Sequence, residues 1–292
     1  METAQKAGRR VSISGMLKIL GVSRSGYNAW RHRRPSDTEK RRKAVKAKIQ
    51  LIYDDSKQNY GAPKITAELR KQGEVISGRT VGKYMKQMGI KAQWCKPWTT
   101  TTRDSDFNSK LQNILNEKFN PERPNAAWCS DITYIWTDTG FVYLTSIMDL
   151  YSRKIIAWTL SDNMEVSCVV DTVNKAISRR KTDQPLIIHS DRGSQYVANE
   201  YLKATNKMQN SYSKKAYPWD NACIESFHAL IKREWLNRFK IRNYLQAYSL
   251  VFEYIEAFYN TKRIHSHCDY MSPNDFEYLY NKILIKADII AG

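Results

Sequence analysis

Long apolar runs and paired cysteines are both lacking in this chain of 292 residues. No apolar run approaches the roughly 18 residues that a membrane-spanning helix needs, and the N-terminus has no signal-peptide pattern. The five cysteines are odd in number and contain no C-x-x-C pair, which excludes a disulfide framework and favours reduced thiols. A structural zinc site would lack its fourth ligand if it were formed by His265, His267 and Cys268. The sequence therefore predicts a cytoplasmic protein.

Acidic residues are also few, at 29 against 47 lysines and arginines, which gives a net charge of +18. A charge of this sign and size predicts a polyanionic partner. The length allows two domains, or one large domain with extensions.

Two of the acidic residues are associated with predicted strands. Asp131 opens a predicted strand that alternates up to Trp136. Asp191 follows the short apolar run of residues 186–188, which is typical of a strand buried on both faces. Gly193 permits the chain to turn sharply just after it. Taken singly, an aspartate at either of these positions is usually a turn or cap residue. Ligands, however, bind beyond the ends of buried strands in open α/β sheets.

A third acidic residue, Glu225, lies in the early turns of a helix that Asp220 or Asn221 can cap. The apolar stripe of this helix consists of Ile224, Phe227, Ile231 and Trp235. A second stripe contains Glu225, His228, Ala229 and Lys232. If the three carboxylates lie side by side, they form a site for hard divalent cations.

The segments around these acids predict an α/β domain. Turn residues 137–140 join the first strand to a second over residues 141–150, so a hairpin is expected. A third strand is expected over residues 154–160 and a helix over residues 165–179. His189 is expected to be a core histidine or to support a ligand, and not to bind metal itself.

The first part of the chain predicts helices with basic faces. Residues 1–34 have the sequence pattern of a helix-turn-helix. Residues 35–92 predict a long basic helix followed by two shorter helices. In the last of these helices Arg79, Lys83 and Lys86 share the outer face. This helix is either a DNA reader or part of a small bundle that contacts phosphates without sequence preference.

The composition of residues 93–124 predicts a linker. Its Trp94 and Trp98 either anchor the linker to the core or stack on bases. Residues 241–292 predict a C-terminal helical extension whose aromatic stripe packs onto the preceding domain, with Arg263 placed near DNA. Ser272-Pro273 begins its last short helix.

Several motifs occur together in a specific order: W-x-S-D-I-T-Y-I, H-S-D-R-G-S-Q-Y, D-N-A-x-I-E-S-F-H with a lysine seven residues after the glutamate, then R-I-H-S and M-S-P-N-D-F. In this combination the chain resembles, over nearly its whole length, the B-frame transposases of the IS-three family of bacterial insertion sequences. These belong to the superfamily of DDE transposases and retroviral integrases.

The resemblance implies an RNase H-like catalytic core over residues 125–240, with a mixed five-stranded sheet flanked by helices. It implies that Asp131, Asp191 and Glu225 are the catalytic residues and the ligands of two Mg2+ or Mn2+ ions. The activity implied is nicking at the element's inverted repeats, followed by attack of the freed 3′-hydroxyl on target DNA through a circular intermediate. The partners implied are DNA, an A-frame protein or A–B fusion, and further copies of the chain in a nucleoid-associated complex.

Basic residues border the expected site. Lys232, two turns from Glu225, either holds a DNA phosphate or is an ordinary solvated lysine. Arg192, Lys214 and Lys215 are expected to follow the DNA backbone.

The chain departs from the family pattern in two places. Between Asp191 and Glu225 lie 33 residues, where the family typically has 35, and the shortening falls between Tyr196 and Gln209. Ser130 stands where a threonine is usual. The alternative to an active transposase is therefore a catalytically inactive DNA-binding regulator or decayed copy. A branched-DNA nuclease of the same fold, and a recombinase that links covalently to DNA, are further alternatives.

Overall fold

The computed structural model describes residues 12–93, 111–182, 184–214 and 217–291. The chain divides into two units, residues 1–51 and 52–292, and the division falls inside helix α4 (Asp37–Asp55). Trp94 and Trp98 of the predicted linker, and Lys215, lie outside the described residues. None of the helices in these ranges is both long and apolar enough to span a bilayer.

Two short helices precede α4 in the first unit. They are α2 (Ile13–Ile19) and α3 (Arg24–Arg31). The hydroxyls of Ser12 and Ser23 cap them, each accepting a hydrogen bond from a backbone N–H three residues on, at 3.2 and 3.0 Å. Gly21, with φ of +65°, makes the turn between the helices. The predicted helix-turn-helix pattern is confirmed here.

Helices α5 (Ala62–Lys71) and α6 (Gly78–Gln87) belong to the second unit. Pro63 lies in the first turn of α5, and Ser77 caps α6 by accepting the N–H of Thr80 at 3.2 Å. Val81 and Met85 are buried in α6. Its predicted basic face, consisting of Arg79, Lys83 and Lys86, is exposed.

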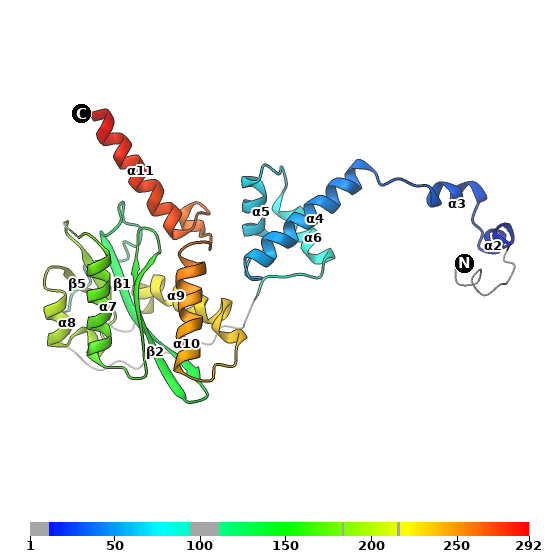
Figure 1. Cartoon of the computed structure of the whole chain (residues 1–292). Helices are drawn as coiled ribbons and strands as arrows, with labels where there is room; N and C mark the ends of the chain where they lie inside the picture. The colour runs from blue at the N-terminus through cyan, green and yellow to red at the C-terminus, as the bar shows by residue number, and fades with distance from the viewer. Residues whose placement is uncertain (1–11, 94–110, 183, 215–216, 292) are drawn as a thin grey trace. The chain divides into compact units, whose positions relative to one another are not determined.

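The core of the second unit is a mixed five-stranded sheet, as expected. Its strands are β1 (Ala127–Thr137), β2 (Gly140–Asp149), β3 (Ile155–Ser161), β4 (Ile187–Ser190) and β5 (Gln209–Tyr212). The spatial order is β3-β2-β1-β4-β5. Figure 1 shows the sheet with helices packed around it. Strands β1, β2 and β3 pair antiparallel, whereas β4 pairs parallel with both β1 and β5.

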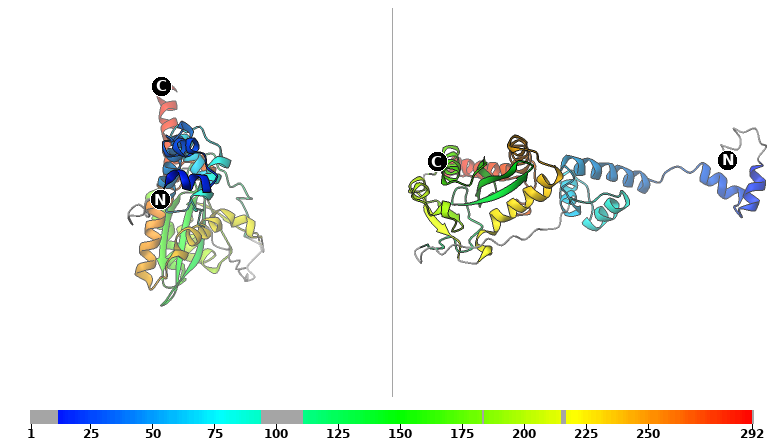
Figure 2. Two further views of the ribbon diagram at one scale, coloured as in Figure 1. Left: turned by 90° about the vertical axis from the view of Figure 1, so that its right-hand side faces the viewer. Right: turned by 90° about the horizontal axis from the view of Figure 1, so that it is seen from below.

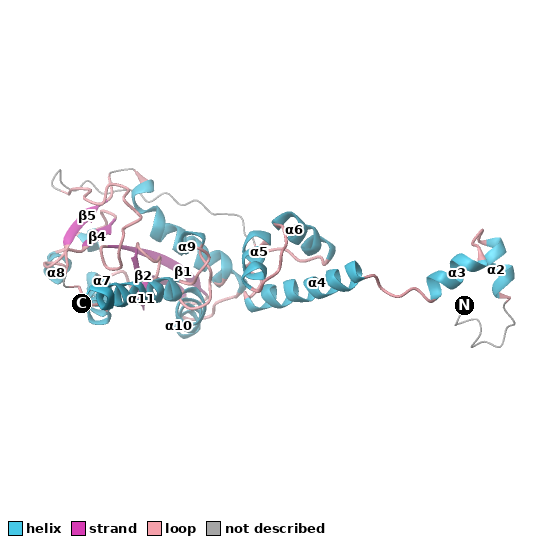
Figure 3. Ribbon diagram, turned by 90° about the horizontal axis from the view of Figure 1, so that it is seen from above, coloured by secondary structure: helices cyan, strands magenta, loops and turns pink. Residues whose placement is uncertain are grey.

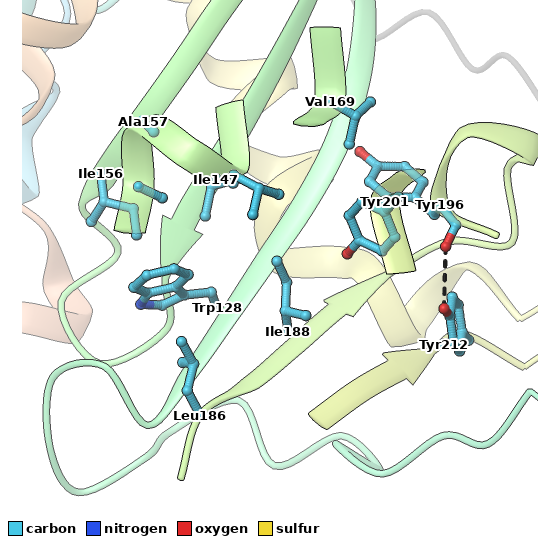
Figure 4. Close-up of a cluster of buried hydrophobic side chains, with 12 residues drawn as sticks. Trp128, Ile147, Ile156, Ala157, Val169, Leu186, Ile188, Tyr196, Tyr201 and Tyr212 are labelled. Carbon is cyan, nitrogen blue, oxygen red and sulfur yellow. Dashed lines mark hydrogen bonds between the residues drawn. The ribbon is translucent and has the colours of Figure 1, made fainter. Parts of the chain in front are cut away.

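The two faces of the sheet carry different helices. Helix α7 (Val166–Arg179) packs on the face to which Trp128, Ile147 and Ile188 contribute, and this face holds the main apolar cluster (Figure 4). The short elements η1 (Ser194–Tyr196) and α8 (Asn199–Ala204) add Tyr196 and Tyr201 to the cluster. Helix α9 (Ala222–Glu234) lies on the other side of the strands (Figure 3).

The chain after α9 is helical, as predicted, but not uniformly so. It contains η3 (Leu236–Arg238), α10 (Tyr244–Phe252), a π-helix η4 (Glu253–Tyr259), η5 (Ser266–Cys268) and α11 (Pro273–Ala291). The π-helix changes which aromatic side chains face inward: Tyr254, Phe258 and Tyr259 are buried, while Tyr248 and Phe252 are exposed. Helix α11 is longer than expected and extends away from the sheet (Figure 2).

Two expectations about local structure were wrong. Asp131 does not open its strand, because β1 begins at Ala127, where parallel pairing to β4 starts. The cap of α9 also differs: Asn221 occupies the N-cap position without a side-chain bond, and Asp220 instead accepts the N–H of Lys214 at 2.7 Å. A 3-10 turn, η2 (Pro218–Asn221), leads into the helix.

The described end of the predicted linker is attached to the sheet. Ser211 in β5 accepts hydrogen bonds from the N–H groups of Ile114 and Leu115, both at 2.9 Å. The Leu115 side chain is buried. The N–H of Tyr212 also donates to the carbonyl of Gln112 at 3.0 Å, so residues 112–115 lie along the β5 edge.

Candidate active site

Two of the three predicted carboxylates come from neighbouring parts of the sheet. Asp131 lies on β1, and Asp191 directly follows Ser190, the last residue of β4. The two strands pair in parallel, and the last pair is Cys129 with His189. Asp131 and Asp191 each lie two residues beyond that pair, so the sheet carries both toward the same end of these strands.

Helix α9 brings Glu225 to this pair. Ile224, Phe227 and Ile231 of the helix are buried, which turns the Glu225 side of the helix toward the end of β1. Burial, together with the negative charges of Asp131 and Asp191, raises the pKa of Glu225. Three carboxylates from three elements thus act on one another electrostatically.

The same helix carries Lys232 toward β1. Its Nζ lies 4.4 Å from the ring centroid of Tyr134. Burial lowers the pKa of Lys232, while the nearby charge of Asp131 acts to raise it. The ammonium group therefore stands between the carboxylates and the aromatic side chains of the hairpin.

His228 supports Asp131, a contact that the sequence did not assign. Its Nδ1 lies 3.2 Å from Asp131 Oδ2, and its Nε2 lies 3.3 Å from Ser146 Oγ. The imidazole is buried, so both ring nitrogens are used inside the fold. The i, i+3 spacing from Glu225 was the signal present in the sequence.

Gly193 has a different role from the predicted one. Its φ is −57°, so the turn does not require the left-handed region. Its N–H donates to Asp191 Oδ1 at 3.0 Å, and an added Cβ would meet the same oxygen at 3.0 Å and Gln195 Oε1 at 3.2 Å. Glycine is needed here for close approach of the backbone to the carboxylate.

His189 is a buried supporting residue, in agreement with expectation. Its Nδ1 lies 2.9 Å from Ser211 Oγ and its Nε2 lies 3.4 Å from Ser213 Oγ. Burial lowers the pKa of His189 to about 4, against a smaller opposing effect of Asp220. The ring is neutral at pH 7 and joins β4 to β5 below Asp191.

The predicted DNA-contact residues around the site differ in their availability. Lys214 is exposed, with Nζ 5.4 Å from the centroid of Tyr217. Arg192 donates from Nε to the carbonyl of Ser213 at 2.7 Å, which holds part of its guanidinium against the protein.

Arg263 is placed in the interior and not at a DNA-facing surface. It forms two hydrogen bonds to Glu234, from Nε at 2.7 Å and from a terminal nitrogen at 2.6 Å, and its exposed fraction is 5%. The guanidinium is used in this buried ion pair. We therefore assign Arg263 a structural role.

The donor set suits a hard divalent cation. Carboxylate oxygens are its preferred ligands. Burial and, after it, the negative charges of Asp131 and Asp191 raise the pKa of Glu225, and a bound cation would neutralise those charges. In the described part of the chain, no three His, Cys, Asp or Glu side chains are close enough to share one ion as they stand. Mg2+ needs only one or two carboxylates and keeps several waters, so this spacing is compatible with it.

Comparisons with known proteins identify the class of domain that this chain contains. A family model described as an integrase core domain matches residues 121–218, a second of that description matches residues 206–273, and an HTH-like domain matches residues 40–98. Two solved structures are similar at a low level. The simian T-cell lymphotropic virus intasome has a TM-score of 0.44 and 14% identity, covering 79% of this chain and 74% of that one. The HTLV-2 integrase catalytic core with magnesium has a TM-score of 0.41 and 15% identity, covering 53% and 98%.

The fold and the matched domains define an enzyme of the DDE transposase and integrase class that acts on DNA. Among curated proteins, the transposase of insertion sequence element IS904 from Lactococcus lactis is 37% identical over 248 residues, which is 84% of this chain and 98% of that protein. Transposase InsF of insertion sequence IS3A from Escherichia coli is 36% identical over 280 residues, 94% and 96% respectively. The chain belongs to the IS3 family of insertion-sequence transposases.

Proposed function

We propose that Asp131, Asp191 and Glu225 are the catalytic carboxylates of this transposase and bind two Mg2+ or Mn2+ ions. The reaction is hydrolytic cleavage of a phosphodiester at each end of the element, followed by joining of the freed 3′-hydroxyl to target DNA. The observation that most supports this proposal is the parallel pairing of β1, which carries Asp131, with β4, which ends just before Asp191.

Bound divalent ions would supply activation of the attacking oxygen and stabilisation of the leaving oxygen. The protein's own residues orient the ligands. His228 holds one oxygen of Asp131, and the N–H of Gly193 holds one oxygen of Asp191. Lys232 is near enough to Asp131 to neutralise a phosphate held there.

DNA contacts outside the site come from basic surfaces. Arg79, Lys83 and Lys86 on α6 are exposed on one helix face, which suits contact with phosphates or with a groove. Lys214 and Arg192, whose Nε and one terminal nitrogen already donate to the carbonyls of Ser213 and Leu111, contact the DNA backbone close to Asp191 in our proposal. Lys215 belongs to the same proposed set. Binding to such surfaces weakens steeply as salt concentration rises.

We further propose that the chain works in the bacterial cytoplasm, at the nucleoid, as several copies in one synaptic complex with an A-frame protein or as an A–B fusion. Its working parts are those expected from the sequence, with residues 35–92 for DNA binding and residues 125–240 for catalysis.

The shortened segment between Tyr196 and Gln209 leaves the site's supports intact. Helix α8 occupies it with Tyr201 buried, and β5 still pairs with β4 over four residues from Ile187 to Ser190. This supports an active enzyme over a decayed copy.

Cleavage and joining of the element's own end sequences with Mn2+ or Mg2+ tests the proposal. Asp191→Asn and Glu225→Gln should each reduce the rate about a thousandfold or more, because several kcal/mol of transition-state stabilisation are lost. DNA binding should persist in both. Glu253→Gln, at an exposed acid on η4, is the matched control.

Cleavage that survives either active-site change would contradict the assignment. If the wild type is inactive alone, the assay is repeated with the A–B fusion. Activity that appears only then establishes the partner requirement, and DNA binding without cleavage in both forms supports the inactive regulator.

A further inference from the structure

Three aromatic side chains are exposed together on the β1–β2 hairpin. They are Tyr134, Trp136 and Phe141, with exposed fractions of 44%, 64% and 45%. Trp136 and Phe141 are directly opposite across the two strands. The Phe141 ring lies edge-on to both others, at centroid distances of 4.8 Å to Trp136 and 5.3 Å to Tyr134. We call these three residues the hairpin aromatic patch.

Two of the three patch residues, Tyr134 and Trp136, lie on the same strand as Asp131. Tyr134 is three residues further along β1, roughly 10 Å at the usual rise of a strand. The β4 pairing in β1 covers only Ala127–Cys129, so β1 runs past β4 as it carries the patch outward. Side chains three residues apart on a strand point to opposite faces, so Tyr134 does not face the Asp131 carboxylate directly. Lys232 lies over the Tyr134 ring and interacts with the charge of Asp131, so a DNA phosphate beside Lys232 is within reach of the patch.

A lysine lies at each end of the patch, one of them paired with an aspartate. Lys232 lies over the Tyr134 ring, as described above. At the hairpin turn, the N–H of Asp138 donates to the carbonyl of Ile241 at 2.9 Å, and its carboxylate pairs with exposed Lys240 at 3.6 Å. Aromatic faces flanked by lysines match the chemistry of a nucleic acid strand, which presents flat bases between phosphates.

We propose that the hairpin aromatic patch stacks against unpaired bases of the DNA end while Lys232 contacts the neighbouring phosphate. The inference rests on the proposed function for the direction of the strand, but it concerns binding and not the chemical step. Stacking on exposed rings tolerates any base, so the patch contributes affinity for frayed ends without reading sequence.

The test uses the full-length protein in EDTA-containing buffer, so that no cleavage occurs. The probes are duplexes with a short 3′ overhang that carries 2-aminopurine, whose emission is quenched when it stacks on an aromatic ring, and matched blunt duplexes. Wild-type protein should quench the overhang probe and bind it more tightly than the blunt duplex.

Trp136→Ala and Tyr134→Ala should abolish most of the quenching and weaken overhang binding by about 5- to 100-fold. Trp136→Phe should restore it. Tyr278→Ala, at a similarly exposed aromatic residue on α11 (68%), is the control and should change nothing. A salt titration separates the contributions, because Lys232→Ala should lower the salt slope by about one and Trp136→Ala should leave it unchanged.

Equal binding of overhang and blunt probes, with quenching that Trp136→Ala does not alter, would overturn the proposal. So would a Trp136→Ala protein that binds normally but loses self-association in light scattering, since the patch would then be an interface between copies. Either result leaves the catalytic carboxylates untouched. Conversely, loss of the cleavage assignment would not affect the quenching measurement.

Discussion

His228 on α9 and Asp131 on β1 are joined by a 3.2 Å contact between Nδ1 and Oδ2. On its other side the imidazole contacts Ser146 Oγ on β2 at 3.3 Å. The ring thus fixes one carboxylate relative to both the helix and the neighbouring strand. Glu225 lies one turn earlier on the same helix, so one contact sets the distance between two proposed ligands.

His228→Ala should therefore lower the cleavage rate by about 10- to 100-fold, the usual cost of losing a residue that orients a metal ligand. The measurement is the initial rate against Mn2+ concentration. A positioning role requires the concentration for half-maximal rate to rise. Ser146→Ala is a milder second variant, and an unchanged Mn2+ dependence in His228→Ala, with only a lower melting temperature, would assign the histidine to stability alone.

Gly193→Ala should impair activity without unfolding the protein. The backbone φ of −57° suits alanine, but the new Cβ would lie 3.0 Å from Asp191 Oδ1 and displace the carboxylate. We expect at least a tenfold loss of cleavage, since small displacements of reacting groups are costly. Gly82→Ala in α6 is the control: its Cβ meets nothing closer than 3.7 Å, and it should add about 0.5–1 kcal/mol of stability.

The buried pair of Glu234 and Arg263 predicts a stability effect. Burial acts to raise the pKa of Glu234, but the hydrogen bond and charge of Arg263 outweigh it and lower the pKa overall. Glu234→Gln should cost about 3–5 kcal/mol in urea unfolding at pH 7, because it leaves a buried charge unpaired. The exposed Lys57–Glu253 pair, at 3.8 Å, gives the comparison: Glu253→Gln should cost under about 1 kcal/mol.

The sign of the pH dependence follows from the lowered pKa. The Glu234–Arg263 pair contributes to the free energy of unfolding of the wild type at neutral pH. This contribution is lost as the pH falls below about 4, through the folded-state pKa of Glu234. The gap in unfolding free energy between the wild type and Glu234→Gln should narrow there. A gap that stays constant from pH 7 to pH 3 would contradict this account.

Asp149 predicts the opposite trend. It is fully buried, and burial, with the negative charge of Glu277, raises its pKa to about 6, against N–H groups of Asn125 and Tyr151 and the charge of Arg180. Because its pKa is raised in the folded state, protonated Asp149 contributes on the order of 2–3 kcal/mol to the free energy of unfolding below about pH 4. This contribution is lost as the pH rises through 6. Asp149→Asn should remove this dependence in urea unfolding measured from pH 4 to pH 7, and an unchanged slope would refute it.

Much of the fold was predictable from local patterns. The hairpin of β1 and β2, the buried strand before Asp191 and the basic face of α6 all follow from periodicity, turn residues and caps, which act over a few residues. The strand start at Ala127 was missed because it depends on parallel pairing with β4, 60 residues away. The π-helix was missed because one extra residue in a turn leaves no clear pattern.

The residues of the site also divide into those that local motifs predict and those whose place depends on distant contacts. Asp131, Asp191 and Glu225 were identified from their motifs, and the register of the sheet supports their assembly. Arg263 was expected near DNA, since a charged residue at the end of a helix is usually exposed. Its burial depends on Glu234, which lies on a different helix and which no local pattern connects to it.

The sequence by itself determined the family, most of the helices and strands, and the three candidate acids, because each depends on residues that are close together or on motifs of fixed order. Only the tertiary structure decided that His228 contacts Asp131, that Gly193 is needed for close approach, and that the hairpin aromatic patch is exposed beside Lys232. Those facts depend on which side chains of different elements meet when the sheet and helices pack, and packing joins residues that the chain itself keeps far apart.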